Sequence, residues 1–96
     1  MSDIETADTR LRRLRMRSIR RGIREMDLIL GAFSKDGLAQ LGPAELDAYE
    51  AMLDENDHDI LAWITGAAVA PEPLAPLISR LTAIARTGTP ERYIGL

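Results

Sequence analysis

The sequence has no cysteine and one histidine, and its aromatic residues are one phenylalanine, one tryptophan and two tyrosines. Without cysteine there are no disulfides, no thiolate metal sites and no cysteine nucleophile. No apolar run approaches the ~18–20 residues that span a membrane. The start of the chain, with Asp3, Glu5 and Asp8, resembles neither a secretory signal nor a mitochondrial transit peptide. We therefore expect a soluble intracellular protein with an aliphatic core.

The motifs that carry catalysis are also missing. There is no nucleophile elbow, no phosphate-binding glycine loop and no dinucleotide fingerprint. His58 lies between Asp57 and Asp59, but adjacent residues on a helix diverge by about 100° and do not converge on one metal ion. We expect no catalytic residue, no metal site and no tightly bound cofactor.

The charges are strongly segregated along a chain of net charge −3. The segment 10–24 holds eight of the twelve Lys and Arg residues and no carboxylate, whereas the segment 25–59 holds ten carboxylates and one lysine. A general nucleic-acid binder would carry a basic excess over the whole domain. Gly22 lies close to the crossover and suits a corner between two helices. We expect the outer surface of that corner to be a recognition feature.

Apolar residues recur at steps of three and four and predict five helices, and no stretch alternates with period two. Ninety-six residues suffice for one domain with a modest core. The prediction is an all-α, compact five-helix bundle that forms a single domain over residues 9–88. A disordered start (1–8) and a flexible tail (89–96) flank it. The expected helices span about residues 9–20, 23–35, 43–53, 57–65 and 74–86.

The first predicted helix has only a narrow apolar stripe, so it should lie on the surface of the core. We expect Tyr49 and Trp63 to anchor the core, with their polar tips near its edge. Asp57 is expected to cap the fourth helix. The stripe of the first helix consists of Leu11, Leu14, Ser18 and Ile19.

Several interpretations of the arginine run remain open. It fits a solvated helix face, or an arginine-rich helical binding module for nucleic acid or an anionic membrane surface. The nucleic-acid reading lacks aromatic or base-reading groups in the run, and the membrane reading lacks a broad apolar face. Arg21 and Glu25 are four residues apart. They could form an exposed ion pair worth about 0.2–0.5 kcal/mol, or Glu25 could cap a free amide near Gly22.

Two blocks of residues, together with the spacing between them, resemble the small succinate dehydrogenase assembly factors, also called the FAD assembly factor family. The segment 21–25 reads Arg-Gly-Ile-Arg-Glu and fits the family signature R-G-x-x-E. The resemblance covers residues 15–66, whereas Ile19 departs from an often aromatic position and the part after Gly66 matches only in having one more helix. The first block continues through Asp27, Leu28, Leu30 and Phe33, and the second consists of Leu46, Tyr49, Leu53, Asp57, Asp59, Ile60 and Trp63.

The resemblance implies a five-helix chaperone, not an enzyme, that binds the flavoprotein subunit of succinate dehydrogenase, and in some bacteria fumarate reductase. It implies that the protein promotes covalent attachment of FAD to that partner. The missing dinucleotide fingerprint predicts that the chain itself does not hold FAD tightly. The acidic start favours a bacterial cytoplasmic member. Such a chaperone needs only a recognition surface that binds the flavinylation-competent state of the apoprotein more tightly than its other states. The partner-binding residues carried over are Arg21, Gly22 and Glu25, with Arg24, Asp27, Arg17 and Arg20 adjacent.

Overall fold

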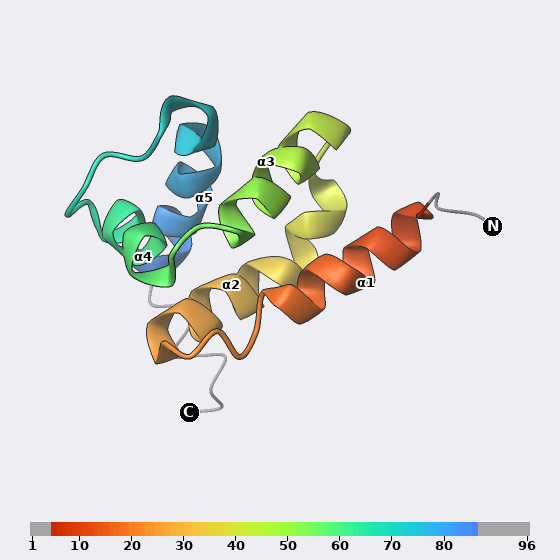
Figure 1. Cartoon of the computed structure of the whole chain (residues 1–96), viewed down its shortest axis with the longest axis horizontal. Helices are drawn as coiled ribbons and strands as arrows, with labels where there is room; N and C mark the ends of the chain where they lie inside the picture. The colour runs from red at the N-terminus through yellow and green to blue at the C-terminus, as the bar shows by residue number, and fades with distance from the viewer. Residues whose placement is uncertain (1–4, 87–96) are drawn as a thin grey trace.

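The computed structural model describes residues 5–86, and these form five α-helices with no strand (Figure 1). The predicted all-α five-helix fold is confirmed, while the predictions for residues 1–4 and for the tail 89–96 lie outside the described residues. None of the described helices has the length and apolar character needed to cross a membrane. The helices are α1 (Ala7–Arg17), α2 (Arg24–Asp36), α3 (Pro43–Leu53), α4 (Asp57–Thr65) and α5 (Ala75–Arg86), with short 3-10 turns η1 (Leu38–Gln40) and η2 (Glu72–Leu74).

The bounds of α1 differ from the predicted span 9–20 at both ends. Thr6 caps the helix, because its Oγ1 accepts a hydrogen bond from the Thr9 amide at 3.1 Å. Residues 7 and 8 therefore belong to the helix and not to a disordered start. The helix ends at Arg17, followed by Ser18, so residues 18–20 lie in the turn toward α2.

The fourth helix begins where expected but with a different cap. Asn56 is the N-cap, since its Oδ1 accepts hydrogen bonds from the amides of His58 (2.8 Å) and Asp59 (3.3 Å). The prediction that Asp57 caps α4 is wrong; Asp57 is its first helical residue and its carboxylate is used elsewhere. Gly66 ends the helix in the left-handed conformation (φ +87°).

The core lies between α2 and the helices that contact it, α1, α4 and α5. Tyr49 is fully buried and stacks on Phe33, with ring centroids 5.6 Å apart. The prediction that Ile19 belongs to the apolar stripe of the first helix is wrong, because Ile19 lies beyond the end of α1 and is 39% exposed. Trp63 is half-buried at the edge of the core. Residues fully buried in the core include Leu14, Met26, Leu30, Leu38, Met52, Ile60 and Leu81.

Candidate functional site

Residues 18–23 form the corner between α1 and α2, as the position of Gly22 predicts. Gly22 has φ +99°, and Arg20 is the one non-glycine residue of the described chain with positive φ (+59°). A Cβ built on Gly22 would meet no atom within 4 Å. Backbone conformation, and not lack of space within the protein, therefore favours glycine at this position.

The Arg21 side chain turns inward from the corner. Its Nε and Nη2 donate to Asp57 Oδ1 at 2.9 and 2.6 Å, its Nη1 donates to the Arg17 carbonyl at 2.9 Å, and its Nη2 also donates to the Leu53 carbonyl at 2.9 Å. The Arg21 and Asp57 side chains are only 12% and 21% exposed. Arg21 precedes the first residue of α2, so the predicted exposed helical pair with Glu25 is wrong.

Asp27 fixes the backbone of the same corner. Its Oδ1 accepts a hydrogen bond of 2.5 Å from the Arg21 amide, which lies six residues earlier in the chain. Asp27 belongs to the first turn of α2. The carboxylate that reaches back across the corner is thus Asp27, whereas the capping role predicted for Glu25 is wrong.

The predicted partner-binding residues divide into two groups. Arg21, Asp27 and Arg17 are half-buried and bonded within the protein. The other residues are exposed and, among residues 5–86, their side chains make no ion pair. This exposed group, which we call the docking corner, consists of Arg20, Gly22, Arg24 and Glu25.

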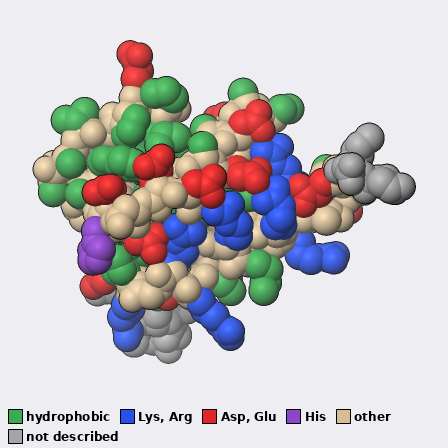
Figure 2. Space-filling view, viewed as in Figure 1, with side chains coloured by type: hydrophobic (Ala, Val, Ile, Leu, Met, Phe, Trp, Pro, Cys, Tyr) green, Lys and Arg blue, Asp and Glu red, His purple; other side chains and the backbone are tan. Residues whose placement is uncertain are grey.

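Half of the arginine run is neutralised inside the molecule by a ladder of ion pairs that was not predicted. Figure 2 shows blue and red side chains interleaved where α1 lies beside α3. The arginines at positions 10, 13 and 17 repeat at helical spacing and face acids with the same spacing at 47, 50 and 54; this matched spacing was the available signal. The four rungs are Arg10–Asp47 (2.7 Å), Arg13–Glu50 (2.7 Å), Arg17–Asp54 (2.6 Å) and Arg21–Asp57 (2.6 Å).

The ladder changes how the arginine run is interpreted. The hydrogen bond from Arg13 lowers the pKa of the Glu50 carboxyl below its ordinary value, and Arg10 adds to that effect. Arginines paired in this way are not available as a row of phosphate contacts. The structure therefore gives no support to the alternative of a nucleic-acid or membrane-binding module.

A buried hydrogen bond at the first residue of the corner holds the end of α1 against α3. Ser18 Oγ lies 2.7 Å from the Leu14 carbonyl and 2.6 Å from Tyr49 Oη. Since Ser18 donates its one hydroxyl hydrogen to Leu14, the Tyr49 hydroxyl donates to Ser18. Burial raises the pKa of Tyr49 to about 12.

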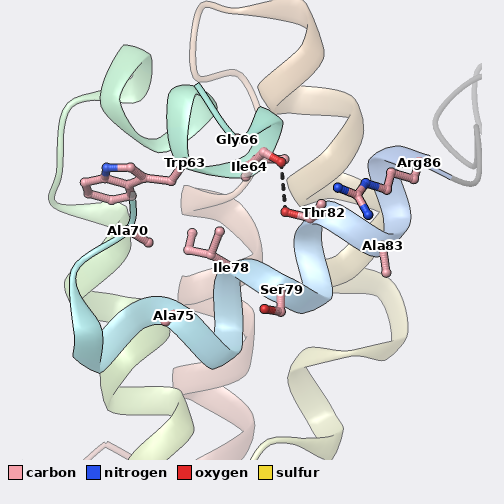
Figure 3. Close-up of a pocket in the computed structure, with 10 residues that line it drawn as sticks. All are labelled: Trp63, Ile64, Gly66, Ala70, Ala75, Ile78, Ser79, Thr82, Ala83 and Arg86. Atoms are coloured by element: carbon pink, nitrogen blue, oxygen red, sulfur yellow. Dashed lines mark hydrogen bonds between the residues drawn. The ribbon is translucent and has the colours of Figure 1, made fainter. Parts of the chain in front are cut away.

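A cavity of about 410 Å³ lies between α4 and α5 (Figure 3). Trp63 lines one side and Arg86 the other, and the Thr82 hydroxyl is already used, since it donates to the Ile64 carbonyl at 2.8 Å. Among residues 5–86 no group of three or more His, Asp or Glu side chains is placed to hold a metal ion.

The fold and the corner together define a small helical protein whose distinctive exposed feature is a charged, glycine-containing turn. The chain matches the family described as "Flavinator of succinate dehydrogenase" over residues 12–85, and it belongs to that family. This range contains the docking corner and its anchors Arg21, Asp27 and Asp57.

Relatives with known names support the same assignment. The chain is 46% identical over 68 residues to "Succinate dehydrogenase assembly factor 2, mitochondrial" of Schizosaccharomyces pombe, covering 71% of this chain and 49% of that protein. It is 48% identical over 61 residues to the protein of that name from Lodderomyces elongisporus, covering 64% and 37%. The chain thus spans about half of the length of these relatives, or less.

Proposed function

We propose that this chain is an assembly factor that binds the flavoprotein subunit of succinate dehydrogenase and promotes covalent attachment of FAD to it. The observation that carries the proposal is the family match over residues 12–85, which includes the whole corner. The relatives are named as assembly factors for succinate dehydrogenase. The same role toward fumarate reductase belongs to this proposal as its extension to a second flavoprotein.

The geometry supports a binding role rather than a catalytic one. The docking corner presents Arg20 before Gly22, and Arg24 and Glu25 after it at the start of α2, so both signs of charge are exposed there. Opposite charges at fixed positions orient a partner and select against wrong ones. Gly22 carries no side chain at the apex, so a partner's backbone can approach closely.

Two further parts of the proposal concern FAD and location. The chain acts on FAD attachment without retaining FAD itself, and flavin absorbance in the purified chain measures this directly. We also propose a bacterial cytoplasmic location, on the basis of the acidic start of the chain. The relatives, in contrast, carry the word mitochondrial in their names.

Co-expression with a succinate dehydrogenase flavoprotein subunit tests the proposal. Covalent FAD is read as fluorescence of the denatured flavoprotein on a gel. We expect the chain to raise this signal and Glu25→Ala to lower it, whereas Glu55→Ala, at an exposed acid between α3 and α4, has no effect. If covalent FAD is the same with and without the chain, the proposed function is wrong.

A further inference from the structure

Two large apolar side chains lie exposed beside the docking corner. Met16 is 65% exposed and Ile19 is 39% exposed. The side chains of Met16 and Ile19 do not pack against α3 or the core. The ladder arginines of α1 face α3, and Leu14 and Ser18 face the core. A third face of α1 and its following turn is therefore left without a partner inside the described structure.

Met16 and Ile19 line a shallow groove between α1 and α2 of about 300 Å³. Its floor comes from α2 and consists of Leu28, Gly31 and Ala32. Ile19 lies over the floor, with its Cγ2 3.7 Å from the position of a Cβ on Gly31. The groove would accept a single apolar side chain of a partner and bury Met16 and Ile19 around it.

The groove is continuous with the docking corner. Asp27 lines it, and the same carboxylate accepts the Arg21 amide that fixes the corner. A protein docked on the corner through Arg20 or Arg24 would therefore also cover the groove. This continuity connects the apolar surface to the surface that we propose for binding.

The charge around the groove indicates what a partner must bring. The charged side chains that line it are Arg15, Lys35 and Asp27, and Asp27 already accepts a hydrogen bond. Arg12, Arg20 and Arg24 are exposed and form no ion pair with any described carboxylate. Arg12 lies four residues before Met16 on the same face of α1. A complementary segment carries an apolar side chain flanked by carboxylates.

We propose that the α1–α2 groove receives an apolar side chain of the flavoprotein subunit, flanked by carboxylates that meet Arg12 and Arg20. The inference rests on the proposed function, because it describes how the flavoprotein subunit contacts this chain beyond the docking corner. A second copy of this chain is the competing occupant.

Titration calorimetry with the isolated flavoprotein subunit tests the groove. Met16→Ser should raise Kd roughly tenfold, since it removes most of an apolar side chain that binding buries. Ile19→Ser should act in the same direction. Val69→Ser is the matched control, because Val69 is 95% exposed on the loop before α5. It should leave Kd unchanged.

The charge part has its own pair of variants. Arg12→Glu should raise Kd by about three- to tenfold at low salt, and the increase should shrink at high salt. Arg86→Glu makes the same change at an exposed site on α5 and should not change Kd. Circular dichroism of each variant confirms that the helices are retained.

Three outcomes overturn the inference. If Met16→Ser and Ile19→Ser bind as tightly as the unmodified chain while Glu25→Ala binds weakly, the groove assignment fails and the proposed function stands. If the chain self-associates in ultracentrifugation and Met16→Ser makes it monomeric without changing Kd, the groove is a contact between copies. If the unmodified chain binds no flavoprotein, both the groove assignment and the proposed function fail.

Discussion

Arg21 donates two hydrogen bonds to one carboxylate oxygen of Asp57, from Nε at 2.9 Å and from Nη2 at 2.6 Å. The same guanidinium binds the carbonyls of Arg17 and Leu53, the last residues of α1 and α3. Those carbonyls lack intrahelical partners. The Arg21 side chain therefore joins the ends of α1 and α3 to the start of α4. It holds the docking corner in place from its inner side.

Removing the Asp57 carboxylate should destabilise the fold more than removing an exposed member of the ladder. Asp57→Ala leaves a half-buried guanidinium without its counterion, and we expect a loss of about 1–3 kcal/mol in the free energy of unfolding. Asp54→Ala is the matched control, since Asp54 is 67% exposed, and it should cost no more than about 1 kcal/mol. Denaturant unfolding measures both. Equal losses would show that the Arg21–Asp57 pair has no special role.

If Arg21 positions the corner, its effect on flavoprotein binding should depend on Asp57. Arg21→Lys keeps the charge but loses the planar fork that reaches its acceptors. We expect weaker binding from this change alone and little additional loss in an Asp57→Ala background. A double-mutant cycle on Kd measures the coupling. Additive effects would mean that Arg21 contacts the partner itself.

Gly22→Ala separates backbone strain from the approach of a partner. Gly22 and Gly66 both have positive φ, and a Cβ on either would meet no atom within 4 Å. Alanine at each site should therefore cost a similar ~1–2 kcal/mol of stability. Only Gly22→Ala should also weaken flavoprotein binding by the folded protein. Equal binding by the Gly22→Ala and Gly66→Ala variants would argue against close approach at the corner.

The ladder should weaken in acid. The pKa of Glu50 is lower in the folded protein than its ordinary value of 4.5, chiefly through the hydrogen bond from Arg13. Its contribution is therefore present above the unfolded pKa and is lost as pH falls through the folded pKa. Thermal unfolding from pH 7 to about pH 3 should show a falling Tm. Glu50→Gln should reduce that pH dependence, and an unchanged slope would contradict this account.

Tyr49 should resist ionisation in base. Its pKa of about 12 lies above the ordinary value of 10.0 because the phenol is buried. The stabilisation that follows is complete below the unfolded pKa and is lost as pH rises through the folded pKa. In a Tyr93→Phe background, absorbance near 295 nm reports Tyr49 alone. An ordinary tyrosine titration in folded protein would show that the ring is accessible to water.

The helices could be predicted because their signals are local. Apolar steps of three and four, Pro43 and Gly66 fixed most elements, and Ser18 is buried as its place in the stripe predicts. Ile19 was misplaced because α1 ends at Arg17, after which helical spacing no longer applies. The cap at Thr6 starts α1 at Ala7, two residues before the predicted start, whereas the cap at Asn56 leaves the start of α4 at Asp57 as predicted.

The interior of the corner could not be predicted in the same way. The Arg21–Asp57 pair joins residues 36 positions apart, and it depends on α1 lying beside α3. Local spacing favoured Glu25 as the partner of Arg21 because both were assumed to lie on one helix. The signature residues lie together at the corner, but their division into inward anchors and an exposed docking corner required the tertiary structure.

Hydrogen exchange of this chain with and without the flavoprotein subunit tests the central claim most directly. The first amides of α2 have no intrahelical acceptor, and the N-cap Ile23 makes no side-chain cap bond, so these amides should exchange rapidly in the free protein. The account predicts that binding slows exchange at residues 22–25 and leaves the loop 66–71 unchanged. Slowed exchange at 66–71 with no change at the corner would contradict it.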